Sequence, residues 1–140
     1  MRAGVVQHLR QAIHTLLFRR FMRIIKMKSI KNLKLKDNEI KAINALKKTI
    51  LDLYPDAEII LFGSRARGDY NKDSDIDMLI LLNTEVNSKL EEKIIGDIYD
   101  IELKYDLIFG ILIKNINEWN YHYSGNPFLK ENISREGMRV

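Results

Sequence analysis

The spacing of apolar and polar residues divides the chain beyond residue 36 into alternating helices and strands. A helix is predicted from Asp37, taken as its N-cap, to just before Pro55, because apolar residues recur there every three or four positions. Two short apolar runs follow, "AEIILF" at 57–62 and "IDMLILL" at 76–82. Both favour buried strands, since each is short and the first is closed by Gly63.

The second half continues the same alternation. Ser88 and Glu91 form a capping-box pattern ahead of apolar residues at helical spacing, so a helix is predicted between the second strand and a third, "YDLIFGILI", at 105–113. Asn126 with Pro127 at the start and Gly137 at the end bracket a last helix. The order is helix, two strands, helix, strand, helix. We therefore predict an α/β fold in which a small mixed sheet of about three or more strands is flanked by helices.

Composition and charge separate a basic leader, residues 1–36, from an acidic domain, residues 37–140. The leader holds ten Lys or Arg and no acid, whereas the rest holds 13 basic and 19 acidic residues, a net charge of −6. Apolar residues alternate with the basic ones, so the leader is able to form an amphipathic helix. Four interpretations remain open: a non-native or mis-assigned extension before a start at Met22 or Met27, a partner-binding helix, a nucleic-acid arm, and a targeting peptide.

Several classes of protein are excluded by what the sequence lacks. No run approaches the roughly 20 apolar residues of a membrane span, so none is predicted. Without cysteine there is no disulfide, thiolate nucleophile or cysteine-bound zinc, and His8, His14 and His122 are too scattered to form a metal cluster. Any metal would be held by oxygen. The composition is compatible with a reducing cytoplasm, where we expect the protein to be found.

Three aspartates are the candidate metal ligands and catalytic groups. Asp75 and Asp77 lie two positions apart at the start of the second strand, so their side chains share one face while the apolar residues between and after them fill the other. Asp106 falls on the third predicted strand, opposite that strand's apolar stripe, and is a candidate third carboxylate. Carboxylates brought this close repel one another unless they are neutralised. Mg²⁺ or Mn²⁺ is the expected cofactor, because both prefer oxygen ligands.

The turn after the first strand is a candidate phosphate site. Gly63 allows positive φ and close backbone approach, so the N–H groups of Ser64 and Arg65 are able to converge on an anion. The hydroxyl of Ser64 and the side chains of Arg65 and Arg67 would add hydrogen bonds and positive charge. This combination suits a nucleoside triphosphate held beside the metal.

The segment "GSRARGDYNKDSDID" resembles the signature of the DNA polymerase β-type nucleotidyltransferases, in which Gly-Ser is followed after ten residues by Asp-x-Asp. More closely it resembles the minimal nucleotidyltransferase (MNT) subfamily, over roughly residues 38–137. The resemblance implies that Gly63 and Ser64 bind triphosphate, that Asp75 and Asp77 hold metal, and that Asp106 is the third carboxylate. It also implies transfer of AMP from ATP to a tyrosine of a paired HEPN ribonuclease toxin, which the MNT protein neutralises as an antitoxin.

The expected function follows from this resemblance and from the size of the domain. Only about a hundred residues follow the leader, so a separate protein is expected to present the acceptor hydroxyl, in a hetero-oligomer. A non-catalytic antitoxin that acts by binding, and a nucleotidyltransferase for a small molecule or an RNA end, are the alternatives.

Each site residue also has an ordinary structural interpretation. The aspartates from 73 to 77 would then form a solvated turn. Asp106 would be an exposed strand residue, for which Glu102 is the substitute candidate ligand, and Arg65 and Arg67 would be surface or ion-pair residues.

Overall fold

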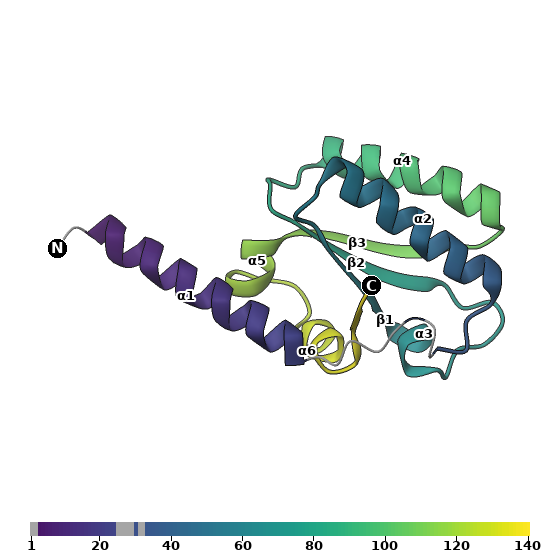
Figure 1. Cartoon of the computed structure of the whole chain (residues 1–140), viewed down its shortest axis with the longest axis horizontal. Coiled ribbons are helices and arrows are strands. Elements are labelled where there is room, and N and C mark those ends of the chain that lie inside the picture. The colour runs from purple at the N-terminus through teal and green to yellow at the C-terminus, as the bar shows by residue number, and fades with distance from the viewer. Residues whose placement is uncertain (1–2, 25–29, 31–32) are drawn as a thin grey trace.

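A computed structural model describes residues 3–24, 30 and 33–140 of the chain. Helices and strands alternate along these residues as the sequence predicts, with additional short elements (Figure 1). In chain order the elements are α1 (Ala3–Ile24), α2 (Asp37–Leu53), β1 (Glu58–Phe62), α3 (Gly63–Arg67), β2 (Ile76–Leu82), α4 (Ser88–Tyr105), β3 (Phe109–Asn115), α5 (Ile116–Tyr121), α6 (Pro127–Glu136) and β4 (Met138–Arg139).

The four strands form one mixed sheet in the order β3-β2-β1-β4. β2 and β3 are parallel and are joined through α4, whereas β1 is antiparallel to both β2 and β4. This confirms the predicted mixed α/β fold. The register places Asp77 of β2 beside Phe62 at the end of β1 and beside Gly110 of β3. The end of β1, where the Gly-Ser turn begins, is thus brought next to the aspartate pair.

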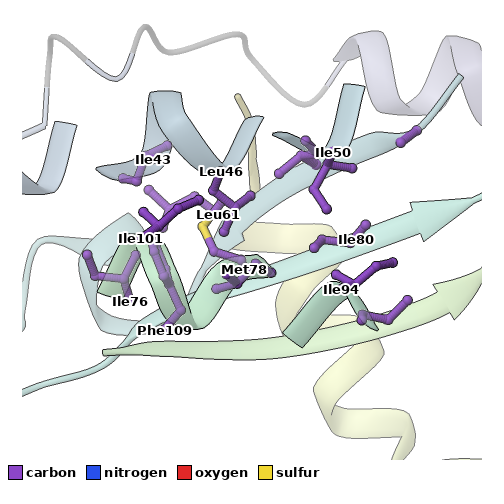
Figure 2. Close-up of a cluster of buried hydrophobic side chains, with 14 of the residues drawn as sticks. Ile43, Leu46, Ile50, Leu61, Ile76, Met78, Ile80, Ile94, Ile101 and Phe109 are labelled. Carbon is purple, nitrogen blue, oxygen red and sulfur yellow. The ribbon is translucent and has the colours of Figure 1, made fainter. Parts of the chain in front are cut away.

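The two faces of the sheet are covered by different helices. α2 and α4 pack on one face, and the larger core lies between them and the sheet (Figure 2). As predicted, alternate residues of β2 enter this core: Ile76, Met78, Ile80 and Leu82. The intervening residues Leu79 and Leu81 pack on the other face with Trp119 of α5 and Ile133 of α6. By the same alternation Asp77 belongs to that second face, at its open end.

The third predicted strand begins later than expected, and this moves Asp106. α4 continues through Tyr105, and Asp106 is its C-cap, with a left-handed φ of 53°. β3 starts only at Phe109, whose backbone N–H donates to the Glu102 carboxylate at 2.7 Å. The prediction that Asp106 lies in a strand is therefore wrong. The segment continues as a helix because Ile101 and Tyr105 still face the core at helical spacing.

Other boundaries differ by smaller amounts. The N-caps of α2 and α4 are Lys36 and Asn87, each one residue before the predicted Asp37 and Ser88. The last helix is confirmed, with Asn126 as N-cap, Pro127 in the first turn and the C-cap at residue 137. The pattern did not predict α5 or β4.

The predicted leader is largely helical in the part that is described. Four apolar side chains of α1 are at least half exposed: Val5, Leu9, Ile13 and Leu16. Met27, one of the two candidate start sites, lies outside the described residues. The four interpretations of the leader stay predictions. Among the residues that the structure describes, no helix is both long and apolar enough to cross a bilayer.

Candidate active site

The carboxylate of Asp77 sits between two glycines. Gly63, the first residue of α3, has a φ of +72°, and a Cβ atom placed on it would overlap Asp77 Oδ2. A Cβ atom on Gly110, the neighbour of Asp77 in β3, would overlap Oδ1. Each carboxylate oxygen is thus in contact with a position that has no side chain. The Gly-Ser turn and β3 together fix where this carboxylate lies.

The electrostatic surroundings of Asp77 oppose its ionisation. Partial burial raises the pKa of Asp77, the negative charge of Asp75 raises it further, and the positive charge of Arg67 partly offsets both effects. A carboxylate pair with a surplus of negative charge suits a divalent cation, since both groups offer hard oxygen donors. Asp75 and Asp77 therefore fit the predicted metal by their chemistry.

Asp75 also lines a cavity of about 480 Å³ between the start of α2, the end of α4 and the loop before β2. Asp106 lines the same cavity, whereas Gly63, Ser64 and Asp77 do not. Within the described parts of the chain, no three acidic or histidine side chains come together in a way that would hold a metal ion. The charge of Asp75 thus acts on Asp77, and Asp106 lies in the lining of the cavity that Asp75 also lines. A metal-binding role for Asp106 stays a prediction.

Arg65 is buried and bridges two parts of the fold. Its Nη1 lies 2.8 Å from Glu39 Oε1 of α2, and its Nη2 donates to the carbonyl oxygen of Ser74 at 3.0 Å. The guanidinium also stacks on the ring of Tyr70, 3.9 Å from the ring centre. These contacts tie the residue before Asp75 to the first turn of α2. They match the ion-pair interpretation of Arg65, and its role towards a nucleotide stays a prediction.

Arg67 is half exposed and connects α3 to α6. Its Nη1 donates to Glu136 Oε2 at 2.9 Å, and its Nε donates to the Asp69 carboxylate at 3.1 and 3.2 Å. These hydrogen bonds raise the pKa of Arg67 above its ordinary value, so the side chain stays charged. Ser64 is half-buried in the first turn of α3. Arg67 is the basic residue of this turn whose charge acts on Asp77.

Two residues of the site were missed by the sequence reasoning. Gly110 had a signal, because a glycine inside an otherwise apolar strand often marks close approach by another group. Glu39 had none that is local. Its carboxylate accepts from the backbone N–H of Lys36 at 2.9 Å, which caps α2, and its ion pair with Arg65 depends on tertiary packing.

A family model for the nucleotidyltransferase domain matches residues 43–139 of this chain. The chain belongs to this nucleotidyltransferase family. The matched region contains both the Gly-Ser turn and the aspartate pair, so the resemblance predicted from "GSRARGDYNKDSDID" is confirmed. The protein is accordingly a nucleotidyltransferase enzyme of the MNT type.

Two curated relatives of this nucleotidyltransferase come from Methanocaldococcus jannaschii. "Putative protein adenylyltransferase MJ0141" is 41% identical over 76 residues, covering 53% of this chain and 77% of the relative. "Putative protein adenylyltransferase MJ0604" is 34% identical over 94 residues, covering 61% and 88%. A solved structure described as "Crystal structure of the toxin-antitoxin with AMP-PNP" has the same fold, with a TM-score of 0.51, 20% identity and coverage of 69% of each chain.

Proposed function

We propose that this nucleotidyltransferase moves AMP from ATP to a hydroxyl group of a partner protein, with a tyrosine as the acceptor residue. The observation that carries the proposal is the position of Asp77. Its carboxylate lies between Gly63 and Gly110, and its pKa is raised by partial burial and by the charge of Asp75. The pair is half-buried at Asp77 and exposed at Asp75. It favours the binding of a cation and of the phosphates that accompany it.

The reaction is an in-line substitution at the α-phosphorus of ATP. The acceptor oxygen forms a bond to this phosphorus, the bond to the β-phosphate oxygen breaks, and pyrophosphate leaves with the electron pair. The proton of the acceptor hydroxyl passes to solvent or to a nearby carboxylate, for which Asp106 is the candidate. Catalysis of phosphoryl transfer rests on positioning and on electrostatic stabilisation, so the protein would align the two oxygens and neutralise the phosphate charge.

The residues divide the work of binding. Asp75 and Asp77 would hold Mg²⁺ or Mn²⁺, which when bound neutralises phosphate charge and stabilises the leaving pyrophosphate. Gly63 and Ser64, at the start of α3, would hold the triphosphate beside it. Arg67 is positioned to add positive charge, since its field already reaches Asp77.

The partner is proposed to be a HEPN-type ribonuclease toxin that the modification inactivates, so that this chain acts as an antitoxin in the cytoplasm. Support comes from the adenylyltransferase names of the two relatives. The fold is also shared with a chain from a toxin-antitoxin structure that was solved with AMP-PNP.

The experiment combines the purified protein, ATP labelled in the α-phosphate, Mg²⁺ and the protein encoded by the neighbouring gene. We expect label on that protein, on a tyrosine identified by mass spectrometry, and none after addition of a chelator. Asp77→Asn should abolish labelling, while Asp52→Asn, on the exposed side of α2, should not change it. Equal labelling by the Asp77 variant would contradict the proposal.

One observation favours a second candidate, an antitoxin that neutralises its partner by binding alone. Asp106 is the cap of α4 instead of a strand residue beside Asp77, and β3 presents Gly110 there. Catalysis would then lack the third carboxylate next to the pair. The same mixture separates the two candidates, because inhibition of the partner without label supports binding alone.

A further inference from the structure

Helix α4 carries apolar residues on its solvent side as well as on its buried side. Ile94, Ile98 and Ile101 face the core. Ile95, Tyr99 and Leu103 recur every four residues along the helix and are 51%, 55% and 65% exposed. A helix that packs on one face of a sheet needs a single apolar stripe. The second stripe has no role in the fold, and contiguous exposed apolar surface commonly marks an interaction site.

This exposed stripe leads into the cavity between the start of α2 and the end of α4. Tyr99 and Leu103 line the cavity that Asp75 and Asp106 also line. Ile108, which is 63% exposed, extends the apolar surface around the same opening. A molecule that covers the stripe would therefore also reach the cavity that Asp75 lines.

The charge around the stripe is negative. Residues 97–106 contain four acids and one lysine. Asp97 is paired with Lys93 at 3.0 Å, but Asp100 and Asp106 are both exposed and appear in none of the ion pairs found among the described residues. Apolar side chains with acidic neighbours are complementary to apolar side chains flanked by Lys or Arg.

We propose that Ile95, Tyr99, Leu103 and Ile108 form the surface on which the acceptor protein docks, through a segment whose apolar side chains are flanked by basic residues. This inference rests on the proposed function and deepens it. Docking here would hold the acceptor at the mouth of the cavity and bring its hydroxyl group towards Asp75. The surface, and not the cavity alone, would then select the acceptor.

The first test compares three leucine or isoleucine variants by calorimetric binding to the product of the neighbouring gene. Leu103→Glu and Ile95→Glu should each weaken binding by about tenfold or more, because a charge is placed within an apolar contact. Leu53→Glu is the matched control, since Leu53 is 48% exposed at the far end of α2. Ile95 does not line the cavity, so its effect would not arise from a distorted active site.

The labelling assay adds a kinetic readout. Both α4 variants should raise the KM for the acceptor protein, and Ile95→Glu, which lies outside the cavity, should leave kcat nearly unchanged because docking precedes the chemical step. Thermal melts by circular dichroism should match the wild type, since the three side chains are about half exposed or more. Asp100→Lys should also weaken binding and reduce its dependence on salt, whereas Asp56→Lys, in the turn after α2, should do neither.

The outcomes separate this surface from the proposed transfer reaction. If both α4 variants bind the partner as tightly as the wild type does, the docking surface is overturned, even if labelling is observed. If both variants lose binding and the wild type gives no label on the partner, the docking surface is supported and the transfer reaction is refuted. Absence of wild-type binding overturns the surface. Light scattering that shows a dimer of the chain alone, returned to monomer by Leu103→Glu, would make a second copy the occupant and overturn the proposal as well.

Discussion

Replacing Arg65 by methionine would remove a buried cation and leave its partner in place. Methionine keeps the unbranched aliphatic stem but has no guanidinium to pair with Glu39, whose side chain is only 5% exposed. The variant also loses the hydrogen bond to the carbonyl of Ser74 and the stacking on Tyr70. The structure thus predicts damage both to the domain and to the loop that carries Asp75.

The cost can be estimated from the partners that remain. Removing one member of a buried ion pair typically costs about 3–5 kcal/mol, because the other charge is left unpaired. Glu39 still accepts from the N–H of Lys36, so we expect the lower end, about 3 kcal/mol. A domain of this size is stable by about 5–15 kcal/mol, and the variant should therefore remain folded in water.

A double variant tests whether the pairing itself is the cause. Glu39→Gln keeps an acceptor for the Lys36 N–H but carries no charge, so adding it to Arg65→Met should restore about 1 kcal/mol or more. Urea unfolding followed by circular dichroism at neutral pH measures all four proteins. Arg135→Met is the matched control, because Arg135 is exposed and donates to Asn132 on its own helix at 2.8 Å.

Two results would refute this reasoning. A loss for Arg65→Met no larger than that for Arg135→Met would show that the buried pair does not stabilise the domain. Additive losses in the double variant would show that the two side chains are not coupled. Either result would count against the ion-pair interpretation of Arg65.

Three further predictions concern the carboxylates and their neighbours. Asp77→Asn should raise the thermal midpoint in the presence of a chelator. The wild type loses stability as the pH rises from the ordinary aspartate pKa through the raised pKa of Asp77, so the difference in midpoint between variant and wild type should grow over that range. A difference that shrinks with rising pH would contradict the burial argument. Gly110→Ala should destabilise by about 1–3 kcal/mol in urea because its methyl group overlaps Asp77, whereas Gly96→Ala, with open space around it, should not; equal effects would refute the close approach. Asp106→Gly should stabilise by about 1 kcal/mol by relieving the left-handed φ, and a lower thermal midpoint would show that the carboxylate itself holds the cap.

The parts of the fold that were predictable are those decided by local alternation. β2 has the predicted bounds, because Ile76, Met78 and Ile80 alternate with residues of the other face and no competing period fits. Asp77 lies in this strand as the pattern predicts, whereas Asp75 lies just before it. The family resemblance depended on residues within this one segment, and the match to the family confirmed it.

The errors arose where two patterns overlapped or where distant segments meet. Tyr105 fits the stripe of a strand with Leu107 and Phe109, and it fits a helix with Ile98 and Ile101 equally well. The helix continued, and Asp106 became its cap. β4 pairs with β1 although most of the domain's sequence separates the two strands. The contacts of Asp77 with Gly63 and Gly110 likewise join three different elements. Such contacts between distant segments leave little trace in periodicity.

The position of the Asp77 carboxylate requires that Gly63 and Gly110 carry no side chain. A mutation at either glycine acts on the same carboxylate, so these three positions are not free to drift independently in evolution. We expect chains that still transfer nucleotides to keep all three together, and chains that have lost the reaction to accumulate side chains at both glycines. The residues at these three positions of a sequence alignment would then distinguish active from inactive members of the family.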